Sequence, residues 1–135
     1  MRALTICQPW AWAVMEGIKR YENRVWDTRY RGPLVIHAGK SRKWLCGVDS
    51  LHHMGFELDE RELTFGAIVG VVDLVECHRR SRMNTADPFA EGPFCWEVLR
   101  PRKLIEPIPY QGRQGLFHVP DKLIEQAVFE AGGIA

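Results

Sequence analysis

The sequence contains few cysteines, and it lacks any apolar run long enough to cross a membrane. Its four cysteines, Cys7, Cys46, Cys77 and Cys95, stand far apart, and none forms a C-x-x-C pair. Zinc sites and disulfide frameworks need closer spacing or an oxidising compartment, so we expect buried free thiols in a reducing cytoplasm. A membrane-spanning helix needs about 20 apolar residues, and no segment reaches that length. The sequence therefore predicts a cytoplasmic protein that uses no metal and no cofactor.

The chain also lacks an excess of charge of either sign. Its 18 basic and 17 acidic side chains give a net charge of +1, so no global positive field attracts nucleic acid. Basic residues do gather in the first third of the chain, at Arg20, Arg24, Arg29, Arg31, Lys40, Arg42 and Lys43. Nucleic-acid binding would therefore depend on a local basic patch.

The length of 135 residues predicts one domain, spanning residues 1–135, because this is enough chain for one core and too little for two. No internal repeat or linker divides it. Strands are expected at residues 3–7, 20–26, 33–38, 66–76, 94–99 with a weak continuation to 105, and 116–119. Helices are expected at residues 9–17, 42–54 and 120–131, and polar loops at 56–64 and 79–92.

Two of these elements carry further expectations. The strand at 66–76 is apolar on both faces, which is typical of a strand buried on both sides or wrapped in a barrel. In the helix at 42–54, Trp44, Leu45, Val48 and Leu51 fall on one side, which predicts a buried face. The pattern as a whole predicts an α+β fold, a small mixed β-barrel of five to six strands flanked by two to three helices.

The segment at residues 17–26 is the most informative in the chain. Read as a turn and a strand, it places Glu22, Arg24 and Trp26 on one face, with Lys19 just before the strand. A carboxylate between two cations beside an aromatic ring is suited to holding a flat polar heterocycle such as a nucleobase, or to moving protons. A surface ion-pair strand with a core tryptophan explains the same residues equally well.

Four other residues have both a structural and a functional interpretation. Trp10 lies on a short apolar helix, where core packing competes with stacking on a ligand. Gln8, at a strand-to-helix corner, is suited to capping the helix or to contacting a ligand. His37 lies on an apolar strand, where a hydrogen-bonded core histidine is the commoner role. Lys40 opens a basic run that is suited to a nucleic-acid backbone or to a solvated helix start.

Taken together, several segments resemble the ASCH domain of the PUA-like superfamily. The signature G-x-K-x-x-E-x-R is present at Gly17, Lys19, Glu22 and Arg24. The resemblance extends over residues 4–11, 31–38, 66–70, 94–97 and 112–117, in the same order as in the family. It implies a β-barrel with flanking helices and a cleft between the first helix and the barrel, lined by the signature side chains.

The resemblance also implies a function. The superfamily is associated with RNA binding and modified-base recognition, and one ASCH branch removes acyl groups from N4-acylcytidines. In that branch the signature lysine works with a threonine three residues later and a distant glutamate; here Glu22 occupies the threonine position. We therefore expect a hydrolase that acts on an N4-acylated cytidine nucleoside or base and releases cytidine and a carboxylic acid.

In this hypothesis Glu22 takes a proton from water, Lys19 stabilises the oxyanion or hands a proton to the leaving nitrogen, and Arg24 completes the catalytic set. Substrate contacts are expected from Gln8, Trp10, Trp26, His37 and Lys40. Two alternatives use the same side chains. The first is an RNA-binding or modified-base-binding module without turnover, and the second is a ribonuclease in which lysine and glutamate act on a 2′-hydroxyl and a phosphate. The expected partner is a nucleoside or RNA.

Overall fold

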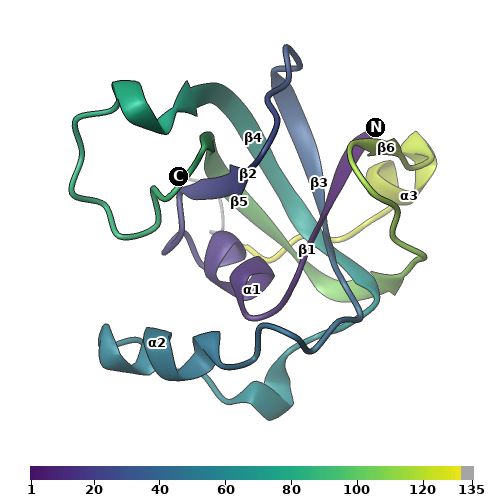
Figure 1. Cartoon of the computed structure of the whole chain (residues 1–135). Coiled ribbons are helices and arrows are strands. Elements are labelled where there is room, and N and C mark those ends of the chain that lie inside the picture. Colours follow the sequence, from purple (N-terminus) through teal and green to yellow (C-terminus); the bar gives the residue numbers. More distant parts are fainter. Residues whose placement is uncertain (132–135) are drawn as a thin grey trace.

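Six strands form one curved sheet in residues 1–131, the part of the chain that the computed structural model describes (Figure 1). The last four residues of the predicted domain, 132–135, lie outside the described residues. The strands are β1 (Arg2–Ile6), β2 (Tyr21–Arg24), β3 (Gly32–Ala38), β4 (Ala67–Arg79), β5 (Phe94–Pro109) and β6 (Phe117–His118). The α-helices are α1 (Trp10–Met15), α2 (Gly47–His53) and α3 (Asp121–Glu125), and single 3-10 turns lie at Glu60–Glu62 and Arg80–Arg82.

The order of strands in the sheet is β2-β5-β4-β3-β1-β6. Only β1 and β3 run parallel, and the other neighbours are antiparallel. This mixed sheet with three helices confirms the predicted α+β fold. Within residues 1–131 the ladder ends at β2 and β6 without joining them, so the curved sheet is an open barrel.

Strand β4 is the centre of the fold, and Gly70 allows α1 to lie directly upon it. The pairing between β4 and β5 shifts register three times, which increases the coiling of both strands. A Cβ atom at residue 70 would lie 2.3 Å from Cε of Met15 and 2.5 Å from the carbonyl oxygen of Arg102. Any larger residue would therefore have to displace the end of the Met15 side chain and the backbone of β5 at Arg102.

The two faces of the sheet have separate cores, as the alternation of side chains along a strand requires. Leu4 and Ile36 pack with α1 on one face. Ala3 and Val35 point the other way and pack with Ile124 of α3. Figure 1 shows α1 and α3 on different sides of the sheet, with α2 away from it near α1.

Strand β5 extends further than the sequence predicts, through Pro101 and on to Pro109. Proline is excluded from the middle of a sheet because it has no N–H to donate. Here β2 pairs only with Phe94–Glu97, and beyond Glu97 β5 has a neighbour other than β4 only at residues 103–105, where residues 128–130 form an isolated bridge. The prolines lie on that part of the strand, and pairing with β4 continues to Pro109.

Two predicted helices are shorter than expected. The helix predicted at 42–54 begins only at Gly47, because residues 43–46 form tight turns, but it ends as predicted, with Gly55 at a φ of +95°. The helix predicted at 120–131 ends at Glu125. The chain then runs back along β5, where Ile105 donates its N–H to the carbonyl oxygen of Val128 at 2.9 Å.

The four cysteines are all free thiols, but they are not all buried. Cys95 is buried, whereas Cys7 and Cys77 are half-buried. Cys46 is exposed at the start of α2, which contradicts the expectation that it is a small core residue. Among the described residues, no helix has the length and apolar character needed to span a membrane.

Candidate functional site

Lys19 is held in place by the tight turn that ends α1. Gly17 has a φ of +75°, a backbone conformation that favours glycine. The backbone N–H groups of Ile18 and Lys19 both donate to the carbonyl oxygen of Ala13 at 3.0 Å. Gly17 therefore ends the helix and turns the chain directly from α1 into β2.

Lys19, Glu22 and Arg24 form one contiguous ionic cluster. Nζ of Lys19 donates to Oε1 of Glu22 at 3.0 Å and also to the carbonyl oxygen of Tyr21. Arg24 approaches the second carboxylate oxygen with Nε at 3.0 Å and Nη2 at 2.8 Å. Lys19 and Glu22 are only 5% and 8% exposed, so both charges depend on these partners. The structure thus brings the three signature side chains together.

Arg24 also connects two strands that the sheet does not pair. Its Nη2 donates to the carbonyl oxygen of Thr5 at 2.7 Å. Thr5 lies on β1, whereas Arg24 lies at the end of β2. The guanidinium therefore bridges the open side of the barrel, and the ionic cluster lies in that opening.

Two donor positions in the cluster remain for a ligand. An ammonium group has three N–H donors, and Lys19 uses two of them. Within residues 1–131 no hydrogen bond involves Nη1 of Arg24. The cluster can therefore still donate to a carbonyl, phosphate or oxyanion oxygen.

The cluster forms one wall of a cavity of about 470 Å³, which we call the cleft. The residues that line it are Thr5, Ile6, Cys7, Trp10, Lys19, Glu22, Asn23, Arg24, Trp44, Phe89 and Glu91. Sites for small ligands typically measure about 300–1,000 Å³ and combine apolar walls with a few polar groups. The cleft fits both criteria, since aromatic rings from three segments surround its one ionic cluster.

Phe89 and Glu91 were not predicted as site residues, because they come from the polar loop before β5. Asn23 holds this loop: its Nδ2 donates to the carbonyl oxygen of Phe89 at 2.9 Å. Its Oδ1 accepts the backbone N–H groups of Glu91 at 2.9 Å and Gly92 at 2.8 Å. The only feature of the sequence that pointed to a role for Asn23 was its position inside the signature segment, and nothing in the sequence linked it to this loop.

The Cys95 thiol also contacts this asparagine. Its Sγ lies 3.5 Å from Oδ1 of Asn23. Burial raises the pKa of the Cys95 thiol, so the group stays protonated at neutral pH and can donate its weak S–H to the amide oxygen.

Trp10 lines the cleft, whereas Trp26 does not. Trp10 is half-buried and meets Phe89 edge to face, with 6.5 Å between ring centroids. Trp26 packs against Trp96 at 4.7 Å and accepts the Trp96 indole N–H with its carbonyl oxygen at 3.1 Å. Because β2 ends at Arg24, the alternation that placed Trp26 beside the charges stops before it. Its expected ligand contact is therefore replaced by a structural role.

Gln8 and Lys40 also lie outside the cleft lining. Gln8 is 2% exposed, accepts the N–H of Trp12 with Oε1 at 2.9 Å and donates Nε2 to the carbonyl oxygen of Thr64 at 2.9 Å. The helix-capping alternative thus describes its position. Lys40 is exposed, and its aliphatic stem passes close to Gly66.

His37 is a hydrogen-bonded core residue, 2% exposed, and does not line the cleft. Its Nε2 lies 2.6 Å from the carbonyl oxygen of Tyr110, which can only accept, so Nε2 carries a proton. Its Nδ1 lies 3.1 Å from Oγ1 of Thr5. A Cβ atom on Gly112 would lie 2.7 Å from the imidazole ring, so glycine is needed beside it.

Among residues 1–131, no group of three or more histidine, cysteine, aspartate or glutamate side chains is placed to hold a metal ion. The polar groups that line the cleft are the ionic cluster, Thr5, Asn23 and the Glu91 carboxylate, beside the aromatic rings of Trp10, Trp44 and Phe89.

An open, curved mixed sheet with a helix packed against it and a charged cluster beside its opening is the arrangement that the resemblance to the PUA-like superfamily implies. The family model for the ASCH domain matches residues 4–109, and the chain belongs to the ASCH domain family.

The chain is also similar to curated proteins and to solved structures. The chain is 27% identical over 134 residues to activating signal cointegrator 1 from Homo sapiens and, equally, from Mus musculus. Each alignment covers 92% of this chain and 23% of the relative, so the chain spans about a quarter of the length of these relatives.

The structural neighbours include ASCH from Zymomonas mobilis, with a TM-score of 0.56 and 14% identity over 94% of this chain and 95% of that one. A point mutant of the same protein has a TM-score of 0.58 and 14% identity, covering 94% and 98% of the two chains. At this identity the likeness is one of fold.

Proposed function

We propose that the cleft binds a cytidine-like base, as a nucleoside or within RNA, and hydrolyses an N4-acyl group from it. The observation that carries the proposal is the buried Glu22 carboxylate between the Lys19 and Arg24 donors, inside an aromatic-walled cavity of about 470 Å³. Membership of the ASCH family supports the nucleobase class of ligand.

Recognition of the base would use groups of both polarities. Glu22 accepts an N–H of the base through Oε1, which has a further lone pair beyond its bond to Lys19. The remaining donors of Lys19 and Arg24 bind the carbonyl oxygens of the base and of the acyl group. Trp10 offers a ring for stacking, an interaction that contributes about 1–3 kcal/mol per base.

Hydrolysis needs a water that loses a proton, an oxyanion that is stabilised and a leaving nitrogen that is protonated. Water gives a proton to a carboxylate and attacks the acyl carbon, its oxygen forms the new C–O bond, and the C–N4 bond breaks as the carboxylate passes that proton to N4. Lys19 and Arg24 donate to the oxyanion. The products are cytidine and a carboxylic acid.

The cleft offers two carboxylates to accept the proton from water. The sequence assigned this role to Glu22, whose two oxygens each contact a cation. Glu91 lines the same cleft and forms no ion pair within the described residues. Because no cation in residues 1–131 pairs with its carboxylate, we propose Glu91 as the base and Glu22 as the residue that positions the two cations and the substrate.

The test is incubation with N4-acetylcytidine and, separately, with a short single-stranded RNA, with chromatography of the products. Release of cytidine that is lost in Lys19→Met and Glu91→Gln but kept in Arg31→Gln supports the hydrolase. Arg31 is a suitable control because its ion pair with Glu76 is exposed. Saturable binding without turnover identifies a binding module, cleavage of the RNA identifies a ribonuclease, and absence of binding contradicts the proposal.

The cytoplasm is the compartment we propose for this activity. The four free thiols, of which Cys46 is exposed and Cys7 lines the cleft, support a reducing environment. Incubation with oxidised glutathione, followed by intact mass, tests how readily these thiols are modified outside such an environment.

A further inference from the structure

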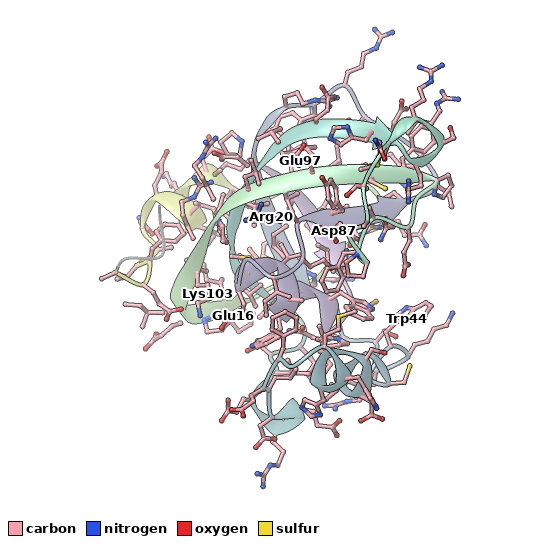
Figure 2. The ribbon with its side chains drawn as sticks, turned by 90° about the vertical axis from the view of Figure 1, so that its left-hand side faces the viewer. Glu16, Arg20, Trp44, Asp87, Glu97 and Lys103 are labelled. Atoms are coloured by element: carbon pink, nitrogen blue, oxygen red, sulfur yellow. The ribbon has the colours of Figure 1, made fainter. Side chains whose placement is uncertain are left out.

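Trp44 is exposed although the helical pattern predicted that it would be buried. Its exposed fraction is 46%, and it lies on the turns at residues 43–46, just before α2. It nevertheless lines the cleft that contains the ionic cluster. Figure 2 shows the indole projecting outward at the periphery of the molecule. The cleft therefore has an aromatic wall at its mouth as well as Trp10 further in.

The backbone fixes the position of the turn that carries this outer ring. Trp44 accepts the N–H of Gly47 at 2.8 Å, which closes a tight turn. Gly47 in turn lies against the start of α1, because a Cβ atom there would be 2.6 Å from Cζ2 of Trp10 and 3.0 Å from Cγ of Pro9. The two tryptophans are thus joined through one close backbone contact, and Trp44 stays beside the cleft.

The turn also carries positive charge that the protein does not neutralise. Nζ of Lys43 lies 5.4 Å from the centroid of the Trp44 ring, and the guanidinium of Arg42 lies 4.2 Å from that of Phe65. None of the ion pairs within residues 1–131 involves Arg42 or Lys43. These cations beside an exposed ring match the pattern of single-strand binding, in which bases stack on aromatics and basic groups follow the phosphates.

We propose that Trp44 forms an outer stacking subsite for the base next to the one in the inner cleft, with Lys43 and Arg42 against the connecting phosphate. The preferred ligand is then a single-stranded RNA of two or more nucleotides, because a free nucleoside has only one base and cannot occupy both aromatic sites. This inference rests on the proposed function for the inner base.

The experiment compares the binding of cytidine with that of an RNA trinucleotide that has cytidine at its centre, by calorimetry. Trp44→Ala weakens the affinity for the trinucleotide by about 5- to 150-fold, the range expected for the loss of one stacked base. The same variant changes the Kd for cytidine by less than about twofold. Trp44→Phe retains most of the affinity. Met54→Ala, an exposed apolar truncation at the far end of α2, leaves both ligands unchanged.

Salt dependence tests the phosphate contact separately. Lys43→Gln reduces the slope of log K against log salt for the trinucleotide by about 0.7, the value for one phosphate contact on a single strand. The slope for cytidine does not change. A trinucleotide slope that stays the same in Lys43→Gln overturns the assigned phosphate contact.

The results separate the outer subsite from the inner one. If Trp44→Ala weakens the binding of cytidine and of the trinucleotide equally, the outer subsite is overturned. Trp44 then contacts the same single nucleoside as the inner cleft. No weakening of either ligand also overturns the outer subsite. If Lys19→Met leaves cytidine binding unchanged, the inner site is overturned. A loss of trinucleotide affinity alone in Trp44→Ala would still establish the outer subsite. A wild-type protein that binds neither ligand overturns both.

Discussion

The guanidinium of Arg24 donates to the carbonyl oxygen of Thr5 at 2.7 Å, and this bond joins β2 to β1 across the open side of the barrel. The same guanidinium binds Glu22, so one side chain both bridges the strands and holds the buried carboxylate. The width of the cleft at this point is therefore set by an arginine, whose planar fork makes both contacts at once.

Replacement of Arg24 by lysine should destabilise the fold although the charge is kept. A lysine has no fork, so either the Thr5 carbonyl or the Glu22 oxygen loses its partner. We expect a loss of about 1.5–3 kcal/mol in the free energy of unfolding, measured by urea denaturation. Arg31→Lys, at the exposed pair with Glu76, should cost less than about 1 kcal/mol. Equal losses at the two sites would contradict the bridging role of Arg24.

Removal of the charge on Glu22 should cost more than removal of the charge on Lys19. Glu22→Gln leaves the buried Lys19 ammonium without a counter-ion, for which we expect a loss of about 3–5 kcal/mol. Lys19→Met leaves Glu22 paired with Arg24, so its loss should be smaller. The double variant should recover part of the Glu22→Gln loss, because the uncompensated charge is gone. Strict additivity in this double-mutant cycle would disprove the coupling.

Asn23→Ala should release the loop that brings Phe89 and Glu91 to the cleft. The variant removes one donor and one acceptor that together hold the backbone at three points. We expect faster hydrogen exchange at the amides of Glu91 and Gly92 and weaker ligand binding, with a stability loss of about 1–3 kcal/mol. Asn23→Asp keeps the acceptor and should preserve more of the amide protection. Unchanged exchange in Asn23→Ala would contradict this.

Much of the architecture could be predicted because it follows from local patterns. The alternation in β1 and β3, the glycine that ends α1 and the spacing of Lys19, Glu22 and Arg24 all act over a few residues. The prediction that these three charged side chains lie together depended only on a turn followed by a strand.

The misplaced residues depend on long-range packing instead. Trp44 matches a helical stripe, but the helix begins later, and the ring is left at the cleft mouth. Phe89 and Glu91 reach the cleft only because Asn23, more than sixty residues earlier in the chain, binds their loop. Trp26 is drawn into the core by Trp96 of β5. Periodicity along the chain contains no information about such distant partners.

Stability at low pH should depend on Asp73. Burial tends to raise the pKa of this carboxyl, but the hydrogen bonds from Arg102 and Arg100 outweigh it, and the pKa is lowered. The folded state therefore binds the proton less readily than the unfolded chain, whose aspartates titrate near about 3.9. The stabilisation is present above that pH and is lost as the pH falls through the folded pKa.

The comparison for Asp73 is between the wild type and Asp73→Asn. Their difference in free energy of unfolding should be constant from about pH 7 to 5 and should shrink below about pH 4, because only the wild type has the carboxyl to protonate. Urea denaturation at several pH values measures it. A difference in free energy of unfolding that is as large at pH 2 as at pH 7 would contradict the assignment of this stabilisation to the ionised Asp73 carboxylate.

The central claim is that the Lys19, Glu22 and Arg24 side chains form the ligand-binding wall of the cleft. The most direct test is a titration of isotope-labelled protein with cytidine, followed by amide NMR. We expect saturable shifts at Thr5, Cys7, Glu22, Arg24 and Phe89, and their loss in Lys19→Met while the fold is retained. Shifts confined to residues outside the cleft, or no saturable shifts at all, would contradict it.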